Sequence, residues 1–202
     1  MAPAAAKHRD TLIATSLSLF QRQGYAATGL AEILAESGAP RGSLYHYFPE
    51  GKEAIAEAAL NTAAEVTEQR IRAGAVQTPD PAAFARAYGR AVAKMMSESD
   101  YRRGCPVATV ALEVSPQSER LTAASASAFC RWSIAIADML HAAGFSPERA
   151  AELGEFMLGS FEGAMILARA QRSTDPITRT AQEIARLLEH ENPKPRSVTC
   201  TE

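Results

Sequence analysis

The sequence contains few of the patterns that mark strands, membrane spans or exported proteins. Runs of alternating β-branched residues bounded by turn residues are missing, so we predict no strand. A membrane span needs about 18 consecutive apolar residues, whereas the apolar runs of this chain, such as 164–168, are short. Residues 1–10 contain no apolar core followed by a cleavage site, so we expect no secretory signal.

Cysteine and the common catalytic motifs are equally scarce. The three cysteines, Cys105, Cys130 and Cys200, lie far apart without a C-x-x-C pair. We therefore expect neither a disulfide framework nor a zinc site, and a reducing cytoplasm fits this usage. The four histidines are scattered, which argues against a metal site of another kind. Because the zinc-protease, phosphate-loop, dinucleotide-binding and nucleophile-elbow motifs are also missing, we predict neither an enzyme nor a cofactor.

The composition indicates a helical globular protein. The 202 residues are 47 % apolar but only 6 % aromatic, and alanine is abundant. The net charge of −2 excludes a broadly basic nucleic-acid coat protein, although it leaves room for a local DNA contact.

Apolar spacing, together with glycine and proline punctuation, predicts about nine helices. We expect them at 7–23, 29–37, 40–48, 52–73, 81–98, 106–114, 116–143, 147–172 and 176–191. The fold class is all-α, with a three-helix head at 1–52, a helical-bundle body at 53–191 and a flexible tail at 192–202. A helix that begins near Lys52 joins the head to the body.

Two short helices in the head surround the turn Ser37-Gly38-Ala39-Pro40, which is typical of a helix-turn-helix. In the second of them, Leu44, Tyr47 and Phe48 share one arc and predict the packed side. The side offered to DNA carries hydrogen-bonding groups from Arg41, Gly42, Ser43, Tyr45 and His46. The alternative is a helical hairpin that serves packing alone, and residues 1–53 carry no net charge (5 − 5 = 0) to decide between the two.

Particular contacts follow from the chemistry of these side chains. The guanidinium of Arg41 can pair with guanine in the major groove. Gly42 permits a close approach of the backbone, and Tyr45 offers its ring to a thymine methyl and its hydroxyl to phosphate. Lys52 begins the next helix, where its ammonium and the backbone N–H groups can hold a phosphate.

The run from Thr28 to Phe48, with its Leu-Tyr-His-Tyr-Phe core, closely resembles the DNA-binding head of the TetR (tetracycline-repressor) family. Gly24-Tyr25 before it and Gly51-Lys-Glu after it extend the resemblance to about residues 9–56. The resemblance implies a bacterial homodimeric regulator, usually a repressor, whose body binds a small inducer. It also implies DNA contacts from Thr28, Arg41, Gly42, Ser43, Tyr45, His46, Tyr47 and Lys52.

The head departs from the family pattern at three positions. Gly29 replaces a second threonine or serine at the start of helix two. Pro40 replaces the serine that usually opens the recognition helix. The common F-x-x-K spacing is lengthened to Phe48-Pro-Glu-Gly-Lys52, as in a branch of the family to which the segments 103–108 and 162–169 are also similar.

The body is expected to enclose a mainly apolar pocket between helices for a small apolar or amphipathic ligand. Its candidate lining residues are Tyr88, Met95, Met96, Tyr101, Cys105, Phe129, Trp132, Phe161 and Met165. The alternative for each is an ordinary core position. Cys105 lies near Arg102 and Arg103, which would favour a thiolate and a redox role; the alternative is a small buried apolar residue.

Gly159 and Gly163 lie four residues apart on one helix face, so another backbone can come close there. The resemblance places the last two long helices in a four-helix dimer interface; the alternative is packing within the chain. A dimer would read a palindromic operator, which an inducer would release by favouring another spacing of the recognition helices. The competing function is a helical ligand-binding or scaffold dimer that does not bind DNA.

Overall fold

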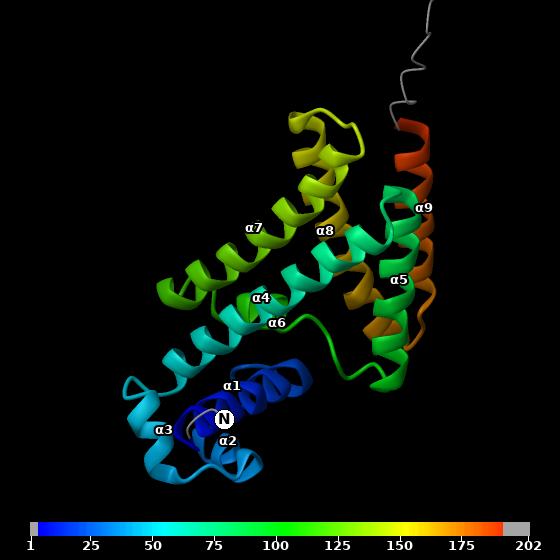
Figure 1. Cartoon of the computed structure of the whole chain (residues 1–202). Helices are drawn as coiled ribbons and strands as arrows, with labels where there is room; N and C mark the ends of the chain where they lie inside the picture. The colour runs from blue at the N-terminus through cyan, green and yellow to red at the C-terminus, as the bar shows by residue number, and fades with distance from the viewer. Residues whose placement is uncertain (1–3, 192–202) are drawn as a thin grey trace, which may run out of the picture.

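Nine helices and no strand make up the part of the chain that the computed structural model describes, residues 4–191 (Figure 1). The expected flexible tail at 192–202 lies outside the described residues. The helices are α1 Ala4–Gln23, α2 Leu30–Ser37, α3 Arg41–Tyr47, α4 Lys52–Gln77, α5 Pro81–Glu98, α6 Pro106–Val114, α7 Glu119–Ala142, α8 Pro147–Gln171 and α9 Asp175–Glu191. The all-α prediction is confirmed.

Proline and a capping side chain define the start of several helices in the body. Pro81, Pro106 and Pro147 each occupy the first turn, where the missing proline N–H costs no hydrogen bond. The residues before them accept a backbone N–H with Asp80 Oδ2, Cys105 Sγ and Ser146 Oγ, respectively.

Three helix boundaries differ from the sequence-based prediction by three residues or more, and the first is the start of α1, at Ala4 instead of residue 7. The helix expected from Pro116 begins at Glu119, because the hydroxyl of Ser118 accepts the N–H of Leu121 and so provides the cap. Helix α4 was expected to end at residue 73 but continues through Gly74 to Gln77. A Cβ on Gly74 would lie 3.0 Å from the Phe84 ring, so this glycine admits the neighbouring helix instead of ending its own.

The head packs its three helices around a small apolar core. The buried side chains of this core come from all three helices: Leu12 and Phe20 of α1, Ile33 of α2, Leu44 of α3, and Phe48 just after α3. Gly38 ends α2 with φ +64°, a conformation that glycine adopts without steric cost. This turn sets the angle at which α3 leaves α2.

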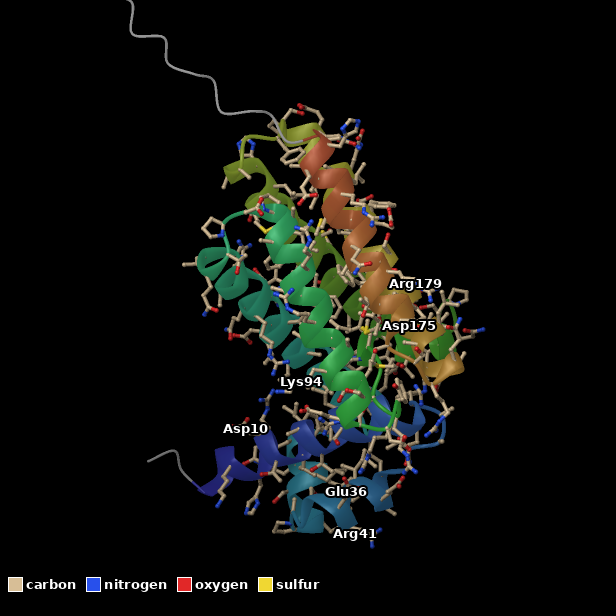
Figure 2. All side chains as sticks on the ribbon, turned by 90° about the vertical axis from the view of Figure 1, so that its right-hand side faces the viewer. Asp10, Glu36, Arg41, Lys94, Asp175 and Arg179 are labelled. Carbon is tan, nitrogen blue, oxygen red and sulfur yellow. The ribbon has the colours of Figure 1, made fainter. Side chains whose placement is uncertain are left out.

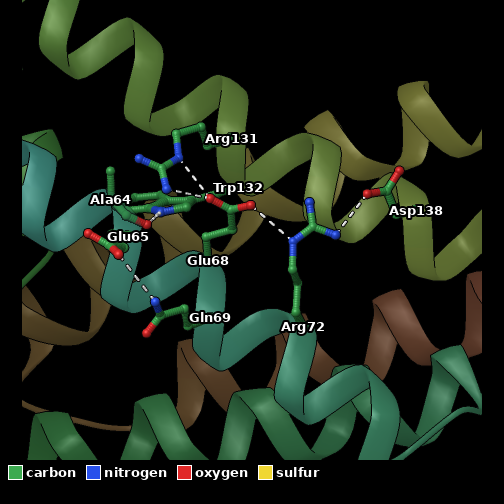
Figure 3. A network of polar contacts seen from close by, with 8 residues as sticks. All are labelled: Ala64, Glu65, Glu68, Gln69, Arg72, Arg131, Trp132 and Asp138. Atoms are coloured by element: carbon green, nitrogen blue, oxygen red, sulfur yellow. Dashed lines mark hydrogen bonds and ion pairs between the residues drawn. The ribbon is translucent and has the colours of Figure 1, made fainter.

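Helix α4 runs from the head into the body, where it packs along α7 (Figure 1). The indole N–H of Trp132 on α7 donates to the carbonyl of Ala64 on α4 at 2.9 Å. Ion pairs also join α4 and α7 at the surface (Figure 3). The carboxylate of Glu68 pairs with the guanidinium groups of Arg72 at 2.9 Å and of Arg131 at 2.7 Å, and Arg72 also pairs with Asp138. Because these ions are partly exposed, the buried indole contact orients the helices more firmly than the surface pairs do.

The head is also held against the body by α6 and α7. The carboxylate of Glu113 on α6 accepts the backbone N–H of Ala26 at 2.5 Å. Arg120 on α7 pairs with Glu57 at 2.6 Å and with Glu50, which lies just before α4. These contacts tie the loop between α1 and α2, and the segment that enters α4, to the body.

Replacing Gly154 with alanine should lower the free energy of unfolding by about 1–3 kcal/mol. A Cβ at this position of α8 would lie 2.7 Å from the carbonyl oxygen of Ser133 on α7, and a backbone atom cannot turn away as a side chain can. The measurement is urea unfolding followed by circular dichroism. Gly42→Ala is the matched control, because nothing lies within 4 Å of its Cβ position and alanine favours a helix by up to about 1 kcal/mol. Equal effects of the two substitutions would contradict the close α7–α8 contact.

Candidate nucleic-acid interface and ligand cavity

Helix α3 presents one packed side and one open side. Leu44 is fully buried, and Phe48 at the C-terminal end of the helix is 4 % exposed. Arg41, Gly42 and His46 are exposed. Arg41 lies at the end of the molecule farthest from the body and points away from the other helices (Figure 2). The open side therefore has the form that a major-groove reader requires.

Three more of the predicted DNA-contacting side chains differ in how far they are exposed to solvent. Half of the Tyr45 side chain is exposed, so its ring and hydroxyl are accessible. Ser43 and Tyr47 are half-buried, and the Tyr47 ring packs edge-on against His46 with 4.8 Å between the ring centres. Tyr47 also contacts the core, as its place on the apolar arc suggested.

Thr28 and Lys52, two of the DNA contacts that the resemblance implies, are engaged within the head in this structure. Thr28 is 1 % exposed, and its hydroxyl donates to the carbonyl of Gly24 at 2.7 Å. In this conformation its side chain holds the loop before α2 and is not available to a phosphate. The ammonium of Lys52 lies 4.1 Å from the centre of the Tyr25 ring and donates to the carbonyl of Ala26 at 3.4 Å. Partial burial lowers the pKa of Lys52, while Glu113 acts in the opposite direction.

The acidic side chains near α3 are already engaged with α1. Glu36 accepts two hydrogen bonds from Arg22, at 2.6 and 2.8 Å, and Glu32 accepts one from Gln23 at 2.9 Å. Arg41 forms no ion pair with the described side chains. Its charge is therefore left for a partner, although the head as a whole carries no excess of positive charge.

A cavity of about 490 Å³ lies between α4, α5, the start of α6, α7 and α8 of the body, and Gln21 near the end of α1 also borders it. Five of the nine predicted pocket residues line it: Tyr88, Met95, Cys105, Trp132 and Met165. The sequence-based prediction does not include the polar residues that also border the cavity, which are Gln21, Thr67, Arg70, Gln77, Thr78 and Glu162. The cavity has the mixture of apolar wall and few polar groups that is typical of ligand sites.

The other four predicted pocket residues lie elsewhere. Met96 is fully buried in the core, one helical step away from the cavity-lining Met95. Phe161 packs edge-on against Tyr88, with 4.9 Å between the ring centres, and lines a much smaller void beside the cavity. Phe129 borders an outer groove between α7 and α8. Tyr101 lies just after the end of α5, and its ring centre is 5.9 Å from the guanidinium carbon of Arg172.

Glu162 is the residue that sequence reasoning missed. It borders the cavity, the smaller void and the outer groove alike. Burial raises the pKa of its carboxyl to about 7, and a hydrogen bond from the Cys105 thiol partly offsets this shift. The signal was present in the sequence, because residue 162 falls on the same helical arc as Leu158 and Met165, where a carboxylate is out of place.

Cys105 is not activated as a thiolate. Burial and the nearby Glu162 raise the pKa of its thiol well above the ordinary value. Its sulfur also accepts the N–H of Ala108 as the cap of α6. The arginines that precede it in sequence are exposed and are not among the causes of its pKa shift.

Gly159 and Gly163 lie on the outer face of α8 with nothing within 4 Å of their Cβ positions. Phe156, Ile166 and Leu167 on the same helix are 52–56 % exposed, and Ile134 on α7 is 49 % exposed. We call this apolar surface, which is about half open to solvent, the α7–α8 face.

The comparisons with known proteins agree with this architecture. Residues 12–59 match the family described as bacterial regulatory proteins, tetR family, and residues 81–183 match the C-terminal domain of LmrA/YxaF-like transcriptional regulators. The HTH-type transcriptional regulators YxaF and LmrA of Bacillus subtilis (strain 168) are 33 % and 34 % identical over 180 residues. These alignments cover 89 % of this chain and 94 % and 96 % of the two relatives.

The chain belongs to the TetR family of transcriptional regulators. It is a DNA-binding regulator, and members of this family are not enzymes.

Solved structures support the TetR fold along nearly the whole chain. The regulatory protein TetR from Rhodobacter sphaeroides superimposes with a TM-score of 0.78 at 24 % identity, over 88 % of this chain and 96 % of that one. A TetR regulator from Legionella pneumophila gives a TM-score of 0.80 at 16 % identity, over 93 % and 99 %. Within the described residues of this TetR regulator, no helix has the length and apolarity of a membrane span, and no cluster of metal-ligating side chains occurs.

Replacing Glu162 with glutamine should stabilise this TetR regulator at neutral pH. Below about pH 4.5 the carboxyl is protonated in both the folded and unfolded states and has no effect. Between pH 4.5 and about 7 only the unfolded chain loses this proton, so the free energy of unfolding of the wild type falls by up to about 3 kcal/mol. Urea unfolding of both proteins at acid and neutral pH measures the difference. A difference that does not grow with pH would disprove the assignment.

Proposed function

We propose that this TetR regulator is a homodimeric repressor that a small molecule releases from a palindromic operator. The observation that carries the proposal is the open side of α3, with Arg41 and Tyr45 accessible and Leu44 and Phe48 holding the helix in place. The body supplies the second part, a cavity bordered by α4 itself. The family supports the rest, since TetR regulators act as dimers with ligand-binding C-terminal domains.

The two recognition helices of a dimer would have to meet one face of duplex DNA about one turn (~34 Å) apart, or a multiple of it. A ligand that prefers another spacing of these helices would weaken the complex in proportion to that preference. Helix α4 supports this coupling, because Thr67, Arg70 and Gly74 border the cavity while Lys52 begins the same helix at the DNA-binding head.

Substituting Arg41 with alanine should weaken operator binding by about tenfold or more per half-site, because a bidentate contact to guanine contributes about 1–3 kcal/mol. Tyr45→Phe, which removes only the hydroxyl, should weaken it by several-fold. The measurement is a gel shift at fixed salt with the DNA that flanks the gene for this protein. Arg90→Ala is the control, because Arg90 is an exposed arginine on α5, outside both the head and the helices of the proposed dimer interface. Unchanged binding by the two head variants would reject α3 as the reading helix.

Replacing Phe156 with glutamate should separate the protomers of the proposed dimer. Phe156 is 52 % exposed on the α7–α8 face, and a buried charge there would cost about 2 kcal/mol or more on each side of a two-fold interface. Sedimentation equilibrium should give twice 21.6 kDa for the wild type and the single mass for the variant. Val76→Glu alters another exposed apolar residue on α4 and should leave the dimer intact. A monomeric wild type, or a variant that still forms dimers, would count against this interface.

A further inference from the structure

The cavity is bordered by an acidic side chain, Glu162, that forms no ion pair with the described residues. Glu162 projects from α8 to the edge of the cavity, where Cys105 is another of the lining residues. None of the described lysine, arginine or histidine side chains is ion-paired with it. A carboxylate withdrawn from water without a positive partner is destabilising, and a well-placed cation offsets much of that cost.

The walls of the cavity are suited to the remainder of such a ligand. Phe84, Tyr88 and Trp132 bring three aromatic rings to the cavity, and Met165 adds a thioether. The faces of aromatic rings attract organic cations as well as apolar groups. Because the Trp132 N–H already donates to Ala64, the indole needs no acceptor from the ligand.

We propose that the cavity binds an amphipathic organic monoamine, whose ammonium group pairs with Glu162 while its apolar part packs against Phe84, Trp132 and Met165. This inference rests on the proposed role of the cavity as the ligand site and names the chemical class of that ligand.

The other groups around the carboxylate favour one positive charge over two. Arg70 of α4 is exposed and borders the cavity. Burial raises the pKa of Tyr88 and Arg70 partly offsets this shift, whereas burial and Cys105 account for the pKa of Glu162. A second ammonium on the ligand would therefore meet the guanidinium of Arg70 near Tyr88 and be repelled. The remaining titratable groups that border Glu162 are Tyr88 of α5 and Cys105 before α6 in the cavity, and Cys130 of α7 and Glu155 of α8 in the outer groove.

The affinity for an amine should depend on pH in a defined direction. The ammonium pairs with the ionised form of Glu162, whose pKa is raised to about 7 in the empty protein. Below this pH the amine must first displace a proton from the carboxyl, so its affinity should increase as the pH rises through about 7 and then level off. Tyr88 and Cys105 remain neutral over this range, because burial raises both of their pKa values.

The test compares three probes that share one apolar part: phenylbutylamine, phenylbutanol and phenylbutyrate. The protein contains a single tryptophan, Trp132, which lines the cavity, so its fluorescence reports binding to the full chain without DNA. At a pH above 7 we expect the amine to bind about tenfold or more tightly than the alcohol, with the acid weakest. Glu162→Gln should remove the preference for the amine and its pH dependence, while the affinity for the alcohol stays within about twofold.

Glu152→Gln is the matched control, since it removes the same charge from the same helix at an exposed position paired with Arg149. It should leave all three affinities unchanged. Equal binding of the amine and the alcohol by the wild type, or an equal loss of all three probes in Glu162→Gln, would overturn the proposal. If Glu162→Gln does not fold, the ranking of the probes and the pH profile of the wild type decide the question.

A gel shift with and without phenylbutylamine separates this inference from the proposed function. Preferential amine binding without release of DNA would support the ligand class and contradict the role of the cavity in repression. Release of DNA by the alcohol and the amine alike would support that role and overturn the ligand class.

Discussion

The continuity of α4 is the constraint on which the rest of the structure depends. Ile55 and Leu60 in its first half are fully buried, and Ile71 near its other end is buried in the body. A continuous helix whose buried residues pack in the core with both the head and the body cannot shift at one end without repacking the other, because protein interiors are close-packed. The head therefore cannot be oriented independently of the body.

This constraint gives the proposed regulation a physical basis. A ligand between α4, α5 and α8 acts on DNA only if it binds one arrangement of the body more tightly than another. Helix α4 borders the cavity in its second half and begins at Lys52, beside the head, in its first turn. The hydrogen bond from Ala26 to Glu113 adds a second connection through α6, whose other end begins beside Cys105 in the cavity wall.

Sequence pattern predicted the helices well where local chemistry determines them, and less well where a neighbouring helix does. The turn at Gly38 was predicted, because a glycine at a helix end has a local conformational reason. The predicted helix stops at residue 73, just before Gly74, because nothing in the sequence reveals that Phe84 packs against this glycine. Among the pocket candidates, Met95 and Met96 are adjacent and alike in composition, yet only the packing of α5 turns one toward the cavity and the other into the core.

The sequence by itself determined the all-α class, the helix-turn-helix and the open side of α3, because capping, turn residues and apolar spacing act within a few residues of one another. The tertiary structure decided that Thr28 is buried, that Lys52 is held by Tyr25 and Ala26, and that Glu162 lies beside a cavity. These outcomes depend on which helices meet and how closely. Such contacts join residues that are distant in the chain, so a local pattern can place Glu162 on the apolar arc of its helix but does not show what that arc faces.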